Sequence, residues 1–158
     1  MVTYDSLVAQ VAQQDFAAFL DEIGTTPAQV DAYRDGLQGV AMMAPEFGNL
    51  HALPSVIDGI GLFTTRALQR DELVAPARIQ GIETLAGRYI NHSPQPNARM
   101  VTGMDGTPMI VALEPIKGDC GQEITMDYRQ ARRELGFAKK SADLQLSPGT
   151  AHDCKAAP

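Results

Sequence analysis

The feature that most limits the fold is the spacing of apolar residues between positions 53 and 128. They occur in short runs, each broken within a few residues by glycine, proline, asparagine or aspartate. Runs of this length fit strands and are too short for long helices. Strands are predicted at 60–65, 73–74, 99–102, 109–113 and 124–128. Asp105-Gly106 predicts a hairpin between two of these strands, and the whole pattern favours a mainly β domain over βαβ units.

The first 45 residues have a helical periodicity instead. Apolar residues recur every three or four positions, and Gly24 ends the pattern; the stripe comprises Leu7, Val8, Val11, Phe16, Phe19, Leu20 and Ile23. The segment 26–29, Thr-Pro-Ala-Gln, has the form of a capping box with proline at the first helical position. It predicts a second, shorter helix through Val30, Tyr33 and Leu37. We expect the pair to cover the main domain, with the shaping of a substrate groove as the alternative.

Length and composition exclude several classes of protein. A chain of 158 residues, 44% of them hydrophobic, allows one compact domain with short appendages. No run approaches the roughly 18 apolar residues of a membrane helix, and the first residues lack the features of a signal peptide, so we expect no membrane partner and a cytoplasmic location. Cys120 and Cys154 lack the spacing of a zinc cluster, so no metal is predicted. The formal net charge of −6 disfavours a nucleic-acid partner.

Three segments carry more information than strands and turns require. Residues 55–63, Ser-Val-Ile-Asp-Gly-Ile-Gly-Leu-Phe, contain a Gly-x-Gly that alone indicates a tight turn and lacks the third glycine of a dinucleotide site. Residues 87–98 contain Asn-His-Ser followed by two prolines. Residues 121–128 end in Tyr128, which alone would be a half-buried strand tyrosine, just as His92 alone would be a structural histidine.

Taken together and in this order, the three segments resemble the SET domain of protein-lysine methyltransferases. The middle segment, Arg-Tyr-Ile-Asn-His-Ser-x-x-Pro-Asn, is the most specific, and the resemblance covers about residues 53 to 130. It implies small β-sheets of the β-clip type with a pseudoknot-like threading of the C-terminal segment, and an α+β fold once the N-terminal helices are included. We therefore expect a helical extension at 1–48, a SET domain at 49–138 and a disordered tail at 139–158. The short form is similar to SET proteins of viruses and bacteria.

The resemblance also implies a cofactor, S-adenosyl-L-methionine, and the residues that would bind it. These are Gly59, Ile60, Gly61, Arg88, Asn91 and His92. The glycine segment would lie along the methionine part through its backbone. The Asn91 side chain would lie near the amino group and the His92 backbone near adenine.

The resemblance makes Tyr128 the catalytic residue, with its hydroxyl beside the transferring methyl group. Tyr89 and Phe137 would line the substrate channel, while Glu123 and Asp127 would hold the last segment through hydrogen bonds. The acceptor would be the ε-amine of a lysine on a protein substrate, for which an acidic chain suits a basic partner.

The sequence departs from the family pattern in ways that leave alternatives open. Pro94 replaces the cysteine that commonly follows Asn-His-Ser, and only residues 74–87 stand where the variable insert would be. Because substrate choice is normally set in that insert, the substrate is not indicated, nor are the oligomeric state and the number of methyl groups added. One alternative is a weakly active or inactive SET-like module that binds the cofactor or a peptide. Another is a β-rich structural domain without a cofactor.

Overall fold

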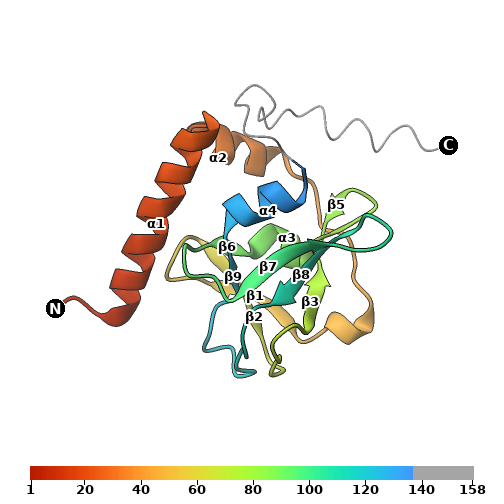
Figure 1. Ribbon diagram of the computed structural model, residues 1–158. Coiled ribbons are helices and arrows are strands. Elements are labelled where there is room, and N and C mark those ends of the chain that lie inside the picture. Colours follow the sequence, from red (N-terminus) through yellow and green to blue (C-terminus); the bar gives the residue numbers. More distant parts are fainter. Residues whose placement is uncertain (137–158) are drawn as a thin grey trace.

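The computed structural model describes residues 1–136, which form an α+β fold with small sheets (Figure 1). Its helices are α1 (Tyr4–Ile23), α2 (Pro27–Gly36), the 3-10 helix η1 (Pro45–Phe47), α3 (Leu85–Tyr89) and α4 (Tyr128–Glu134). Its strands are β1 (Leu50–Pro54), β2 (Ile60–Thr64), β3 (Leu73–Pro76), β4 (Arg78–Ile79), β5 (Ile82–Glu83), β6 (Asn91–His92), β7 (Ala98–Thr102), β8 (Pro108–Ala112) and β9 (Thr125–Met126). The predicted fold class is confirmed.

Both N-terminal helices begin and end where local chemistry dictates. Helix α1 starts at a capping box made by Thr3 and Ser6, and it ends at Gly24, whose φ of 68° is in the left-handed region that glycine tolerates. Helix α2 starts at the predicted capping box, in which Thr26 and Gln29 each accept a hydrogen bond from the other's backbone N–H. The two helices are therefore defined by sequence signals close to their ends.

The buried face of α1 differs from the predicted stripe. Leu7 and Val11 are each 49% exposed, whereas Ala9 and Ala12 are buried. The small alanine side chains let the first half of the helix lie close to the rest of the domain. Leu7 and Val11 lie on a neighbouring strip of the helix and face solvent, so the prediction that they belong to the packed stripe is wrong.

A sheet of five strands brings distant segments together, in the order β3-β8-β7-β9-β6. Strands β7 and β8 form the predicted antiparallel hairpin. Strand β9, the last in the sequence, lies between two earlier strands and is parallel to both. Its pairing with β6 sets Asn91 opposite Thr125 and His92 opposite Met126, so the second and third sequence motifs lie side by side.

The last predicted strand is shorter than expected. We predicted a strand over 124–128, but β9 ends at Met126 and Tyr128 is the first residue of α4. Asp127 causes the change, because its side chain accepts a hydrogen bond from the N–H of Arg129 at 2.9 Å and so caps the helix. Tyr128 is therefore a helix residue and not a strand tyrosine.

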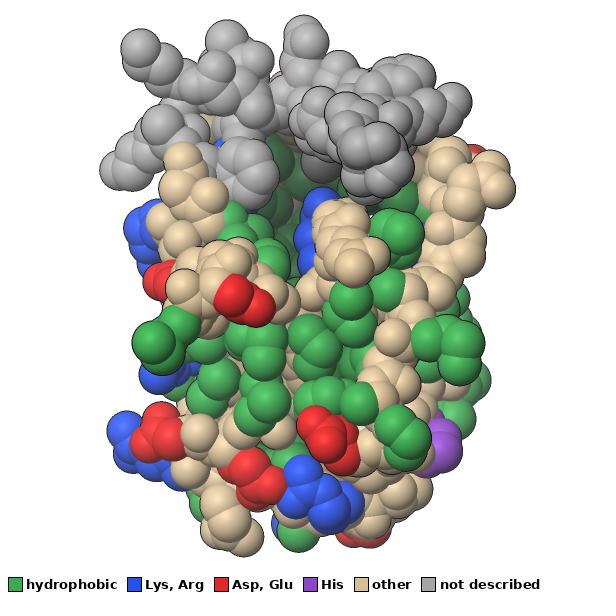
Figure 2. Space-filling model, turned by 90° about the vertical axis from the view of Figure 1, so that its right-hand side faces the viewer, with side chains coloured by type: hydrophobic (Ala, Val, Ile, Leu, Met, Phe, Trp, Pro, Cys, Tyr) green, Lys and Arg blue, Asp and Glu red, His purple; other side chains and the backbone are tan. Residues whose placement is uncertain are grey.

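The core fills the space between the sheets. Its largest fully buried side chains lie on or between the strands and include Leu62, Leu68, Ile110, Ile116 and Ile124. Figure 2 shows the side of the molecule away from α1, where hydrophobic side chains gather across the middle and charged side chains lie mainly below them. No helix within residues 1–136 is long and apolar enough to cross a membrane.

Helix α3 packs closely on the strands at Gly87. A Cβ atom at this position would lie 2.0 Å from the carbonyl oxygen of Ala77, which is backbone and cannot easily move. We predict that Gly87→Ala lowers the free energy of unfolding in urea by roughly 1–3 kcal/mol. Gly36→Ala in α2 is the matched control, since its Cβ meets no atom within 4 Å, and it should leave stability unchanged or raise it. Equal effects of the two substitutions would contradict this packing.

Candidate functional site

The side-chain amide of Asn91 connects the first and third sequence motifs. Its Nδ2 lies 2.7 Å from Oε1 of Glu123, 3.0 Å from the carbonyl oxygen of Asp58, and 3.2 Å from both the carbonyl oxygen of Ile60 and Oγ of Ser55. The amide NH2 group has only two N–H bonds to donate, so the four acceptors around it outnumber the hydrogens that it offers. These acceptors form a polar cluster around the buried side chain of Asn91 at the start of β6.

Glu123 is the charged member of this group. Its Oε2 accepts a hydrogen bond from Oγ of Ser55 at 2.7 Å, and its Oε1 faces Asn91. Burial raises the pKa of the carboxyl above its usual range, against these two hydrogen bonds, and the nearby charge of Asp58 acts in the same direction as burial. Among residues 1–136, no ion pair includes Glu123, so its charge is not balanced by a basic side chain.

The two glycines of the first motif have different roles. Gly59 has a φ of 49°, which a residue with a side chain adopts only with strain. Gly61 lies against Glu123, because a Cβ there would be 2.2 Å from Oε1 of that residue. Gly61 therefore leaves room for the Glu123 carboxylate, while Gly59 allows the chain to turn.

His92 has a partner at each ring nitrogen. Its Nδ1 accepts the backbone N–H of Tyr128 at 3.1 Å, and its Nε2 lies 2.7 Å from Oδ2 of Asp15 in α1. The imidazole is buried, and its Nδ1 must carry a lone pair to accept from Tyr128. The hydrogen of the neutral ring is therefore on Nε2 and points to Asp15.

Tyr128 is held at its other end by the segment that carries His92. Its hydroxyl donates to the carbonyl oxygen of Ile90 at 2.7 Å. Burial raises the pKa of the hydroxyl to about 12. The phenol is therefore neutral at pH 7 and acts as a hydrogen-bond donor rather than as a base.

Helix α1 closes one side of this arrangement. The rings of Phe16 and Phe19 lie 6.1 and 5.9 Å from the His92 ring, and 5.9 and 6.0 Å from the Tyr128 ring. Phe19 is stacked on His92 with an interplanar angle of 17°. The two phenylalanines and Asp15 thus enclose the imidazole from the N-terminal side.

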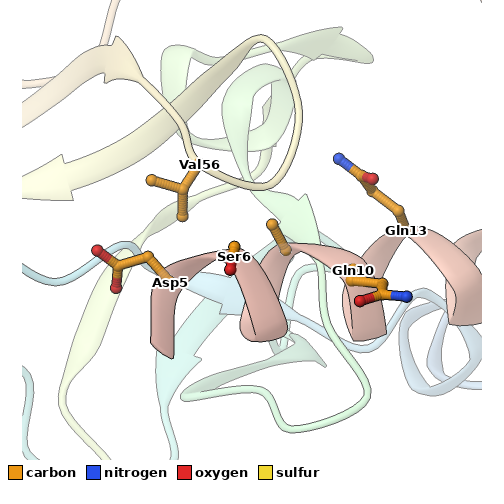
Figure 3. Close-up of a pocket in the computed structure, with 6 residues that line it drawn as sticks. Asp5, Ser6, Gln10, Gln13 and Val56 are labelled. Carbon is orange, nitrogen blue, oxygen red and sulfur yellow. The ribbon is translucent and has the colours of Figure 1, made fainter. Parts of the chain in front are cut away.

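A hollow of about 430 Å³ lies between α1 and the first motif. In Figure 3, Asp5, Ser6 and Gln10 lie along the helix and Val56 faces them from the loop. Gln13 also lines the hollow, and its Nε2 donates to the carbonyl oxygen of Ile57 at 2.5 Å. The 55–59 loop is therefore tied to α1 next to the Asn91 group.

The remaining predicted site residues are placed differently. The Nε of Arg88 lies 3.4 Å from Oε2 of Glu83 in β5, and no hydrogen bond within residues 1–136 joins its guanidinium to Asn91 or His92. Tyr89, the last residue of α3, is half-buried. Phe137, the other predicted channel residue, lies outside the described residues.

The sequence analysis missed the part of the site that α1 supplies. Asp15, Phe16 and Phe19 are far from the motifs in sequence, and the two phenylalanines were interpreted only as packing residues. One signal was available, because Asp15 is a charged residue between Ala12 and Phe16 on the packed side of an amphipathic helix. The sequence gives no indication of which distant side chain such a residue meets.

Comparison with known proteins finds one family model that matches part of the chain. Residues 75–129 match the model of the SET domain family, a range that includes Asn91, His92, Glu123 and Tyr128. This part of the chain is similar to the SET domain. A crystal structure of a Plasmodium falciparum protein, proposed to be a histone methyltransferase, is similar with 20% identity and a TM-score of 0.40, over 51% of this chain and 92% of that one. No curated protein matches this sequence.

The polar group around Asn91 fits a positively charged ligand. S-adenosylmethionine carries positive charges at its amino group and its sulfur and a negative charge at its carboxylate, so its net charge is positive. The backbone carbonyl oxygens of Asp58 and Ile60 are acceptors for an ammonium group, and the unbalanced carboxylate of Glu123 complements its charge. Within residues 1–136, no group of histidine, cysteine, aspartate or glutamate side chains could hold a metal ion.

The raised pKa of Glu123 predicts how stability depends on pH. Its ordinary value is 4.5, so on raising the pH the unfolded chain releases this proton before the folded protein does. Over that interval ionisation of Glu123 lowers the free energy of unfolding. We predict that the wild type loses stability relative to Glu123→Gln as pH rises above about 4.5. The check is urea unfolding of both proteins between pH 4 and pH 8, and parallel curves would contradict the prediction.

Proposed function

We propose that the protein transfers a methyl group from S-adenosylmethionine to the ε-amine of a lysine on a protein substrate. The observation that carries the proposal is the fixed position of Tyr128, whose hydroxyl is bound to Ile90 and whose backbone N–H is bound to His92. The match of residues 75–129 to the SET domain supports the reaction class.

The cofactor would be held by the residues around Asn91. When bound, S-adenosylmethionine supplies an electrophilic methyl group on a positively charged sulfur. We assign the backbone of residues 59–61 and the Asn91 side chain to its methionine part, with the Glu123 carboxylate balancing its charge. The His92 backbone would contact its adenine. The acceptors around Asn91 and the left-handed turn at Gly59 support these assignments.

Tyr128 would act by position rather than by accepting a proton. Its hydroxyl stays neutral at pH 7 because burial raises its pKa to about 12. The oxygen keeps lone pairs that can contact a polarised methyl group through weak C–H···O interactions. Together with the carbonyl oxygen of Ile90, it would place two oxygens beside the path of transfer.

The substrate lysine must lose its proton before it reacts. At pH 7 deprotonation of an ordinary lysine, with a pKa near 10.4, costs about 4–5 kcal/mol. An apolar channel lowers this cost because it disfavours the charged form. Tyr89, half-buried at the end of α3, is the described residue that we assign to this channel, and the lysine proton would pass to solvent.

Tyr128→Phe tests the proposal. We predict that this variant binds S-adenosylmethionine as the wild type does but transfers methyl groups about 100-fold more slowly, since it lacks the positioned oxygen. Tyr4→Phe is the matched control, because Tyr4 is 80% exposed at the start of α1. The measurement is transfer of radiolabel from S-adenosylmethionine to proteins of a whole-cell extract, with cofactor binding measured by calorimetry.

The outcomes separate the candidate functions. Label that depends on Tyr128 and is unaffected in the control supports the enzyme and reveals its substrate by size. Cofactor binding without label in any extract would support a SET-like binding module instead. Equal transfer by wild type and Tyr128→Phe would remove Tyr128 from its assigned role, and no cofactor binding at all would overturn the proposal.

A further inference from the structure

We propose that Asp15 of α1 is a positioning residue, which fixes the orientation and the tautomer of His92 and through it the backbone of Tyr128. The part of the inference that concerns His92 stands on geometry alone, whereas its effect on turnover rests on the proposed function. The N-terminal helix would then be part of the functional site and not merely a cover.

The contacts form a continuous chain from α1 to α4. Oδ2 of Asp15 is 2.7 Å from Nε2 of His92, and Nδ1 of the same ring accepts the N–H of Tyr128 at 3.1 Å. The rings of Phe16, Phe19 and Tyr128 surround the imidazole at 5.1 to 6.1 Å between centroids. The histidine is therefore held by one polar partner at each nitrogen and by aromatic rings around it.

The two hydrogen bonds of His92 depend on each other. Nδ1 can accept from Tyr128 only if it carries no hydrogen, which places the hydrogen of the neutral ring on Nε2. A buried Nε2–H needs an acceptor, and Asp15 supplies it. Without that acceptor, the ring would gain by turning over or by moving its hydrogen to Nδ1, and either change would break the bond to Tyr128.

The bond to Tyr128 matters because of where α4 begins. Tyr128 is the first residue of this helix, so its N–H has no partner within the helix. Asp127 caps the next N–H, that of Arg129, and leaves the first to His92. Tyr128 is thus held by His92 at its backbone and by Ile90 at its hydroxyl, and loss of either contact would free one end.

Asp15 itself is held in place by Arg129. Nη1 of Arg129 lies 2.7 Å from Oδ2 of Asp15, while the same guanidinium binds both oxygens of Glu22, about two turns further along α1. Partial burial opposes ionisation of Asp15, but the hydrogen bonds from His92 and Arg129 outweigh it and hold its pKa below the usual value. Asp127 lies 4.0 Å from Nδ1 of His92, too far for a hydrogen bond. Of the two carboxylates near the ring, that of Asp15 is therefore the one that accepts a hydrogen bond from it.

The test compares three single substitutions with the wild type. Asp15→Ala removes the acceptor, Asp15→Asn keeps an oxygen that can accept from Nε2, and Glu22→Ala removes a carboxylate from the same arginine without touching His92. The readout is the ¹⁵N chemical shift of the two imidazole nitrogens of His92, which distinguishes a protonated from an unprotonated nitrogen. Cofactor binding by calorimetry with S-adenosylhomocysteine, and kcat separately from KM, complete the measurement.

We expect wild type, Asp15→Asn and Glu22→Ala to show His92 with its hydrogen on Nε2 at pH 7. In Asp15→Ala we expect a mixture of tautomers and faster exchange of the Tyr128 amide proton. Because misplacement of a reacting group costs up to roughly 100-fold in rate, we expect kcat to fall by about 10- to 100-fold in Asp15→Ala, with little change in Asp15→Asn or Glu22→Ala.

Several results would overturn the inference. A wild-type His92 with its hydrogen on Nδ1 would do so even if a variant failed to fold. An unchanged tautomer and unchanged kcat in Asp15→Ala would do the same. If the tautomer behaves as expected but the wild type neither binds cofactor nor labels any protein, the positioning of His92 is supported while the proposed function fails.

Discussion

The parallel pairing of β6 with β9 is the interaction on which the rest of the site depends. Each strand is only two residues long, yet the pairing joins segments more than thirty residues apart and sets His92 opposite Met126. It places Tyr128, two residues beyond β9, within reach of both His92 and Ile90. Bringing together segments so far apart in the sequence costs loop-closure entropy, so such short strands need support from side chains. Asn97 gives some of it, because its side chain accepts from the N–H of Thr125 and donates to the carbonyl oxygen of Glu123.

The same network explains why the three motifs have the residues they do. Asn91 binds backbone oxygens of the 55–60 segment and the Glu123 carboxylate, so it needs an amide that donates in several directions. Position 61 needs glycine because the Glu123 carboxylate occupies the space that a side chain there would fill. Each motif is thus shaped first by its contacts with the others. The cluster they form is rich in hydrogen-bond acceptors and contains the Glu123 carboxylate, and the proposed cofactor role rests on that property.

Much of this arrangement could be predicted from local sequence signals, and the rest could not for definite reasons. The helix caps at Gly24 and Thr26 and the hairpin around Asp105 act over a few residues, so the sequence predicts them well. The strand predicted to reach Tyr128 was too long because the apolar pattern does not reveal the capping by Asp127. The contact between Asp15 and His92 spans 77 positions, and only the packing of α1 brings it about. The motif residues were selected because the motifs resemble a known family, and their roles stay predictions; the guanidinium of Arg88 pairs with Glu83, which the sequence did not indicate.

The most direct test of the central claim, that the three motifs form one cofactor site, is an NMR titration of ¹⁵N-labelled protein with S-adenosylhomocysteine. The account predicts saturable changes in the amide signals of residues 59–61 and 90–93 and of Tyr128, with smaller changes in the part of α1 that contacts His92. The β4–β5 hairpin, which lies outside the Asn91 group, should change little. Saturable changes confined to other surfaces, or no change at millimolar ligand, would contradict the account.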